Sequence, residues 1–174
     1  MKNKIILFIF FSYFFFYNLS HGEIIKFESP ELKILDNGTK IIANNGVIAE
    51  SDDGILINAD EGTYNKKDNI LKFFGNIIIK DNIQNLKSTS NEIIYSKNTN
   101  IINIIGESET SIEDKYSINS ENLVYDRNKM EIFSEGIIEL EDMLGNKIEG
   151  KNLKFKINES IVKGKDLKIY DIQK

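Results

Sequence analysis

The chain of 174 residues contains no cysteine, no tryptophan, one proline and one histidine. Without cysteine it forms no disulfide bond and is not processed as a lipoprotein. The single histidine, His21, lies in a region that we expect to be removed, which excludes Ser–His and Cys–His nucleophile pairs from the mature chain. Basic patches with interleaved aromatic residues are also lacking, so we expect no nucleic-acid partner. These absences predict a protein that is not an enzyme and that carries no metal ion or cofactor.

The first 22 residues differ from the rest of the chain. Lys2 and Lys4 precede an apolar run over residues 5–17, and small residues at Ser20 and Gly22 offer a cleavage site. This is the pattern of a secretory signal peptide, and the run is shorter than the roughly 20 residues that span a bilayer. We therefore predict a signal peptide at 1–22 and one domain at 23–174, with an uncleaved anchor as the alternative. Loss of the two lysines would lower the net charge from −5 to −7.

The remainder of the chain is built from a repeat of about 30 residues. The repeat carries one aromatic residue and, 9 or 11 residues later, one glycine: Tyr64, Tyr95, Tyr125 and Phe155, then Gly75, Gly106, Gly136 and Gly164. A fixed period of this length is typical of stacked repeats. A degenerate opening copy runs from Glu23 to Asp53 and contains a hairpin pattern around Asp36-Asn37-Gly38.

Alternation of apolar and polar residues predicts that each repeat is a pair of β-strands. From Met130 to Glu141, small or apolar residues occupy every second position, which is the pattern of a strand with one buried face. The first strand of each repeat changes parity, and one extra residue near Glu121-Asn122 would restore it, as in a β-bulge. Polar turns of hairpin length, such as residues 65–69, join the strands. An amphipathic helical stripe is absent, so the predicted fold class is all-β, with antiparallel β-hairpins stacked along one axis.

In such a stack each inward position repeats along the axis. The row Tyr64, Tyr95, Tyr125 and Phe155 would then lie beside a second row of Leu71, Ile102 and Ile132. One interpretation is an ordinary β-sandwich core. The other is that the layers close incompletely and leave a slot for alkyl chains, whose burial is worth about 0.8 kcal/mol per CH₂. The candidate slot residues are the inward apolar side chains Tyr64, Phe73, Ile77, Ile104, Ile118, Tyr125, Ile132 and Ile138.

Two acidic pairs are candidates for a metal or catalytic site. Asp52-Asp53 has the composition of a turn, and no EF-hand spacing follows it. Asp60-Glu61 occupies a slot of the repeat that holds Lys151-Asn152 in the last copy. Since that slot accepts lysine, we interpret both pairs as structural.

The repeat resembles the OstA/LptA-like domain of lipopolysaccharide transport. The similar segments are Ala59-Asp60-Glu61-Gly62-Thr63-Tyr64 and Phe73-Phe74-Gly75-Asn76-Ile77-Ile78-Ile79, and the resemblance extends over about residues 34–172. It implies a twisted, incompletely closed β-jelly roll in the periplasm, which carries lipopolysaccharide to the outer membrane with acyl chains in the slot. The long barrel that follows this domain in LptD is absent from the sequence. A domain separated from an LptD-type translocon and a structural β-solenoid surface protein remain the alternatives.

An incompletely closed stack has two unpaired edges, which recruit further strands unless they are blunted. Lysines 163, 165 and 168 lie on the last strand, and Glu23, Glu28 and Glu31 lie in the opening copy, near Pro30. We therefore expect edge-strand addition to other lipopolysaccharide transport components, or head-to-tail self-association.

Overall fold

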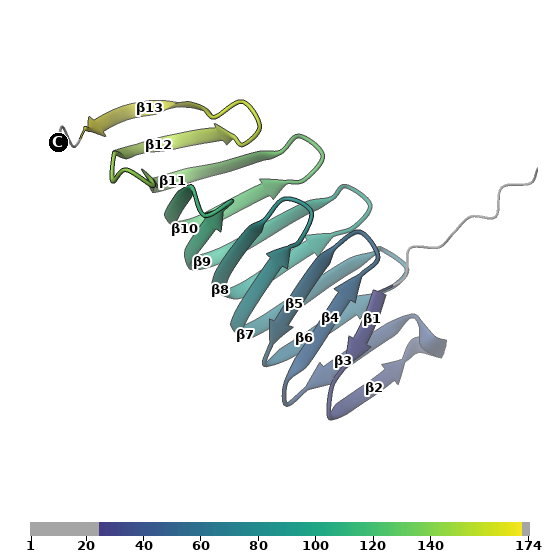
Figure 1. The fold of residues 1–174 in the computed structure, drawn as a ribbon. Helices are drawn as coiled ribbons and strands as arrows, with labels where there is room; N and C mark the ends of the chain where they lie inside the picture. The colour runs from purple at the N-terminus through teal and green to yellow at the C-terminus, as the bar shows by residue number, and fades with distance from the viewer. Residues whose placement is uncertain (1–24, 172–174) are drawn as a thin grey trace, which may run out of the picture.

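The computed structural model describes residues 25–171, and these form a single antiparallel sheet of thirteen strands folded into two layers (Figure 1). One turn of 3-10 helix, Asp36–Gly38, joins the second and third strands. The all-β prediction is confirmed. The strands are β1 (Ile25–Glu28), β2 (Glu31–Leu35), β3 (Lys40–Asn44), β4 (Val47–Ser51), β5 (Ile55–Ala59), β6 (Glu61–Asn65), β7 (Ile70–Asp81), β8 (Leu86–Ser96), β9 (Ile101–Ile112), β10 (Tyr116–Asp126), β11 (Glu131–Asp142), β12 (Lys147–Lys156) and β13 (Ile161–Tyr170).

Long strands that bend in the middle give the molecule its two layers. The first half of β7 pairs with β6, which pairs with β3, and β3 pairs with β2. The second half of β7 pairs with β5, which leads to β4 and β1. Strands β8 to β13 then follow in order, each contributing to both layers. We call the layer that contains β2, β3 and β6 layer A, and the layer that contains β1, β4 and β5 layer B. Each layer ends in a series of turns, and the two series face each other across what we call the mouth.

The glycine column marks the bends. Gly75 and Gly106 have φ of +74° and +83°, a region that side chains disfavour. At Gly75 the strand β7 has one residue more than its neighbour, because Phe74 pairs with Glu92 and Ile77 with Ser90. The predicted bulge is therefore present, but its extra residue lies on the glycine-bearing strands. Opposite Glu121-Asn122, the extra residue belongs to β9 and β11 and not to β10.

The inward aromatic and aliphatic residues of layer A form one continuous ladder. Tyr64 pairs with Leu71, which pairs with Tyr95, and the same alternation continues across every later strand. The two rows that the sequence suggested are thus a single row, because neighbouring strands contribute alternate members. The ladder consists of Ile34, Ile41, Tyr64, Leu71, Tyr95, Ile102, Tyr125, Ile132, Phe155 and Val162.

The two ends of the stack differ. At the amino-terminal end, Phe27 of β1 reaches across from layer B, and its ring centroid lies 6.0 Å from Tyr64 and 6.1 Å from Phe73. At the other end, β13 pairs with β12 alone, and nearly all its side chains are exposed. Ile169, which continues the inward row of layer B after Ile148, is 70% exposed. The first inward residue of layer A, Ile34, is likewise 67% exposed, so each end of the stack leaves an inward apolar residue uncovered.

Candidate functional site

The eight candidate slot residues all lie in the space between the layers. Five come from layer A and three from layer B, and each is at most 8% exposed. All belong to one buried cluster. Their own side chains fill the space between the layers, so an alkyl chain would have to displace protein contacts to enter. The layer A residues are Tyr64, Phe73, Ile104, Tyr125 and Ile132, and those of layer B are Ile77, Ile118 and Ile138.

Small hydroxyl residues occupy the middle of the interior, which the sequence analysis did not anticipate. Ser88 and Thr110 hydrogen-bond to each other at 2.8 Å, and Ser120 Oγ donates to Ser134 Oγ at 3.1 Å. Ser108 donates to the carbonyl oxygen of Ser120 at 3.0 Å. Because these groups satisfy one another, burying them carries no large penalty. The sequence signal for them was their position on the buried face of each strand. Their small hydroxyl side chains make this part of the interior more polar than the ladder.

Two hollows reach toward the interior at the level of the glycine bends. One, of about 700 Å³, combines the inward Ser108 and Ser120 with an acidic rim that includes Glu107 and Glu121. The other, of about 330 Å³, lies beside Gly136. Both hollows therefore lie at the bends and not along the aromatic ladder.

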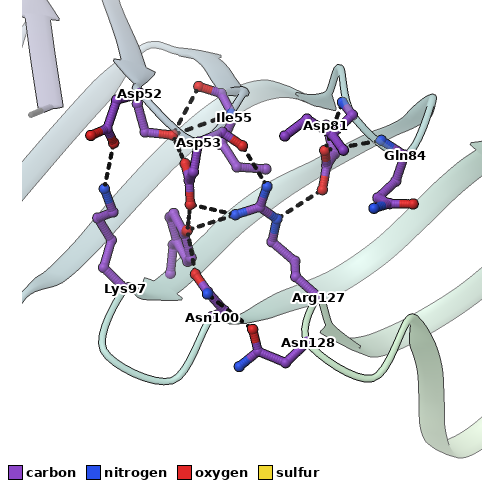
Figure 2. A network of polar contacts seen from close by, with 12 residues as sticks. Asp52, Asp53, Ile55, Asp81, Gln84, Lys97, Asn100, Arg127 and Asn128 are labelled. Atoms are coloured by element: carbon purple, nitrogen blue, oxygen red, sulfur yellow. Dashed lines mark hydrogen bonds and ion pairs between the residues drawn. The ribbon is translucent and has the colours of Figure 1, made fainter. Parts of the chain in front are cut away.

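A charged network joins the two layers at the mouth (Figure 2). Arg127, in the turn between β10 and β11 of layer A, lies between two carboxylates of layer B. Its Nη1 is 2.5 Å from Asp53 Oδ2, and its Nη2 donates to the Asp53 carbonyl oxygen at 2.8 Å. Its Nε is 2.8 Å from Asp81 Oδ2. The side chains of Arg127 and Asp81 are 9% and 0% exposed, so this ion pair is buried. A buried ion pair is stable only when its geometry and hydrogen bonds compensate for the lost hydration of both charges.

Neighbouring groups extend the network. The hydroxyl of Tyr95 donates to Asp53 at 3.0 Å, and that of Tyr125 donates to Asp81 at 3.1 Å. Lys97 Nζ lies 3.4 Å from Asp52 Oδ1, and its side chain is 1% exposed. Asp52-Asp53 is indeed a turn, between β4 and β5, but it also supplies half of this network, which the sequence analysis missed.

Burial and hydrogen bonding shift the pKa values of these groups. Burial by itself would raise the pKa of Asp53, but hydrogen bonds from Ser51 and Arg127 outweigh it and hold that pKa below its usual value. Burial, and then the nearby charge of Asp53, raise the pKa of Tyr95. Burial would lower the pKa of Arg127, yet its hydrogen bond to Asp81 raises it. Asp53 and Arg127 are therefore ionised at neutral pH, and Tyr95 keeps its proton and acts as a donor.

Metal-binding chemistry has no support in the part of the chain that the structure describes. No group of three or more His, Cys, Asp or Glu residues there is arranged to hold an ion. Asp60, the second acidic candidate, lies at the bend between β5 and β6, where its carboxylate accepts a hydrogen bond of 2.8 Å from the side chain of Asn76. Its contacts are those of a residue that fixes a bend.

An elongated β-jelly roll with an apolar interior and a free edge strand is the class of domain that these features define. Among solved structures, the chain is similar to LptH of Pseudomonas aeruginosa, described as the LptA-homologous periplasmic component of the lipopolysaccharide transport device. The match has a TM-score of 0.50 and 10% identity, and covers 87% of this chain and 96% of that one, so it shows a shared fold. No curated protein matches the sequence.

Residues 16–163 match the family described as "Lipopolysaccharide-assembly, LptC-related". This span is most of the chain, and the protein therefore belongs to the LptC-related lipopolysaccharide-assembly family. The resemblance to lipopolysaccharide transport domains is confirmed. Within residues 25–171, no helix is long and apolar enough to cross a membrane. The predicted signal peptide lies outside the described residues and stays a prediction.

Proposed function

We propose that this protein is a non-enzymatic carrier that binds the acyl chains of lipopolysaccharide between its two layers, in the periplasm, and passes the lipid toward the outer membrane. The observation that carries this proposal is the ladder of inward residues from Tyr64 to Phe155, which runs without interruption along the stack. A continuous apolar row gives an alkyl chain equivalent contacts at successive positions, so movement along it has no large barrier from desolvation. Family membership supplies the lipid class.

The proposed binding residues are the eight inward side chains named above, for which the structure provides burial on both layers. A photo-crosslinking amino acid tests them. Placed at Ile132 or Phe73, it should capture lipopolysaccharide. Placed at Glu131 or Lys72, the adjacent positions on the same strands whose side chains take the opposite parity, it should not. Equal capture on both parities would contradict a binding site between the layers.

Passing lipid to a neighbour requires that the slot continue into another molecule. Strand β13 offers ten residues of unpaired edge, and its exposed Ile169 continues the inward row of layer B to that edge. Lys168 lies near the edge with only a long contact, 3.8 Å, to Glu149. At the other end, Glu31 begins the edge strand β2 and pairs with Lys33. We propose that transport partners, or further copies, add strands at these edges.

Single cysteines at Glu31 and Lys168 test this addition, because the chain has no native cysteine. A mixture of the two variants should form disulfide-linked dimers, and the doubly substituted protein should form longer species as its concentration rises. A protein that stays monomeric at high concentration and has no affinity for transport proteins would contradict edge addition. Of the alternatives, the family match favours an LptC-related protein over a separated LptD domain or a β-solenoid surface protein.

A further inference from the structure

Apart from the contact between Arg127 and Asp53, which are 74 residues apart, the contacts across the mouth follow a similar offset along the chain. Each layer A residue at the mouth meets the layer B residue about 44 positions away: Tyr95 with Asp53 at 42, Lys97 with Asp52 at 45, Tyr125 with Asp81 at 44, Arg127 with Asp81 at 46, and Ser160 with Tyr116 at 44. The mouth is therefore a series of three steps. Step one joins the turns at residues 52–53 and 97, step two joins Asp81 and Arg127, and step three joins Tyr116 and Ser160.

The chemistry of the steps changes along the series. Steps one and two are held by ion pairs, and Arg127 binds both because it contacts Asp53 as well as Asp81. At step three, the positions equivalent to Arg127 and Asp81 are Ile157 and Ile112, 30 and 31 residues later, which are 7% and 0% exposed. A neutral hydrogen bond of 3.1 Å between the exposed hydroxyls of Tyr116 and Ser160, and an edge contact of Tyr116 with Phe155, join the layers there.

These two kinds of contact respond differently to an alkyl chain. A chain that inserts between two apolar side chains replaces one apolar surface by another, so little free energy is lost. A chain that inserts between Arg127 and Asp81 leaves a buried carboxylate without its partner, which costs far more. The charges of the network also sum to −1, from three aspartates against Arg127 and Lys97, so the network does not attract an anionic headgroup.

We propose that Arg127 is a latch that keeps the two layers together over steps one and two, so that the mouth opens sideways to an acyl chain at step three alone. The chain then moves along the interior from there. The statement about lipid rests on the proposed function, whereas the statement about the layers does not. Arg127 acts here as a positioning residue, since it fixes where the layers separate.

Distances between spin labels test the latch without lipid. One pair, at Asn82 and Lys129, spans step two, and a second pair, at Lys115 and Glu159, spans step three; all four positions are exposed turn residues. We expect a narrow distance distribution at step two and a broader one at step three. The double variant Arg127→Gln/Asp81→Asn removes both charges of the step-two pair, and Asp53, which also loses its cation, keeps hydrogen bonds from Ser51 and Tyr95. It should broaden the step-two distribution to the width of step three.

A matched control removes an ion pair that stays within layer A, in Lys154→Gln/Glu131→Gln, whose charged atoms are 2.8 Å apart. This control should leave both distributions unchanged. The latch is overturned if the Arg127→Gln/Asp81→Asn variant, folded by circular dichroism, keeps the narrow step-two distribution, or if the two steps are equally narrow in the unmodified protein.

Photo-capture with purified lipopolysaccharide tests the path. With the latch intact, capture by a crosslinker at Phe155 should precede capture at Ile102, a ladder residue beside Tyr95 and outside the network, several-fold in time. The latch variant should reduce this lag. Simultaneous capture in the unmodified protein would overturn the sideways path. Absence of capture at both positions, combined with the expected label distances, would instead refute lipid binding and leave the latch in place.

Discussion

Replacing Ile132 by alanine tests whether the space between the layers is a packed core when no lipid is bound. Ile132 is 0% exposed and lies between Tyr125 and Phe155 in the ladder. The control is Ile137→Ala, on the same strand, where the side chain is 58% exposed. Both changes remove the same atoms from β11, so they differ only in the environment of those atoms.

The expected cost follows from burial. Alanine lacks three methyl or methylene groups of isoleucine, and at about 0.8 kcal/mol each their transfer is worth about 2.4 kcal/mol. A residual cavity adds to this, because Tyr125 and Phe155 are held by their strands and relax only partly. We therefore expect Ile132→Ala to lower the free energy of unfolding by about 3 to 5 kcal/mol. The exposed control should change it by about 0.5 kcal/mol or less.

Urea denaturation of the lipid-free protein, followed by circular dichroism, measures the difference. With a slope of about 2 kcal/mol per molar, the midpoint of Ile132→Ala should fall by roughly 1.5 to 2.5 M, and that of Ile137→Ala should move little. Equal small losses in two folded variants would show that the layers stand apart without lipid, which would refute the packed interior.

Three further predictions concern the bends and the mouth. Gly75→Ala should destabilise by about 1 to 2 kcal/mol, because φ is +74° and the new Cβ would lie 2.4 Å from Asp60 Oδ2. Gly136→Ala, whose Cβ would meet only Ser134 Oγ at an ordinary contact distance of 3.8 Å, should be neutral or stabilising in the same denaturation assay. Tyr125→Phe should cost about 1.5 to 3 kcal/mol, since it removes a hydrogen bond to a charged and fully buried carboxylate, and Tyr116→Phe, which loses a bond to exposed Ser160, should cost less. Because the pKa of Asp53 is lowered in the folded protein, its ionisation stabilises the fold at pH values above its unfolded pKa of about 3.9, and this contribution is lost as the pH falls through the folded pKa. The urea midpoint of Asp53→Asn should therefore converge with that of the unmodified protein below about pH 4. Midpoints that stay equally far apart at lower pH would contradict this.

Local alternation made the strands of this fold predictable. The pattern from Met130 to Glu141 corresponds to β11, in which Ile132, Ser134, Ile138 and Leu140 are buried. Which face of a strand a side chain points to depends only on its position in that strand, so it can be predicted from the local sequence. The bulge was visible for the same reason, as a change of parity. Which strand carries the extra residue depends on the pairing of two strands, and the sequence analysis placed it on β10 when it lies on β9 and β11.

The mouth network could not be predicted in this way. Arg127 and Asp53 are 74 residues apart, and their contact depends on how far the two layers are displaced along the stack. That displacement arises from strand twist accumulated over several pairs, which no local pattern records. The turns that hold Lys97 and Arg127 looked like ordinary polar turns, and Asp52-Asp53 looked like another. Their exposure within the fold, 1% for Lys97 and 9% for Arg127, is what separates them from solvated turn residues.

The repeat itself nevertheless carried a signal for the change along the mouth. Two residues after each aromatic residue of the ladder stand Lys66, Lys97, Arg127 and Ile157, so the last copy replaces a cation by an apolar side chain. On layer B, Asp81 is followed 31 residues later by Ile112. With the offset of about 44 residues between the layers, the positions of Ile157 and Ile112 belong to the same step of the mouth. Both layers therefore lose their charge at that step, and each residue keeps a partner of matching chemistry. A charge kept on one layer alone at step three, at position 112 or 157, would be buried without a counterion, which folding does not tolerate at this depth. The paired substitution therefore changes the strength of the closure from one step to the next, while Ile112 and Ile157 themselves stay buried.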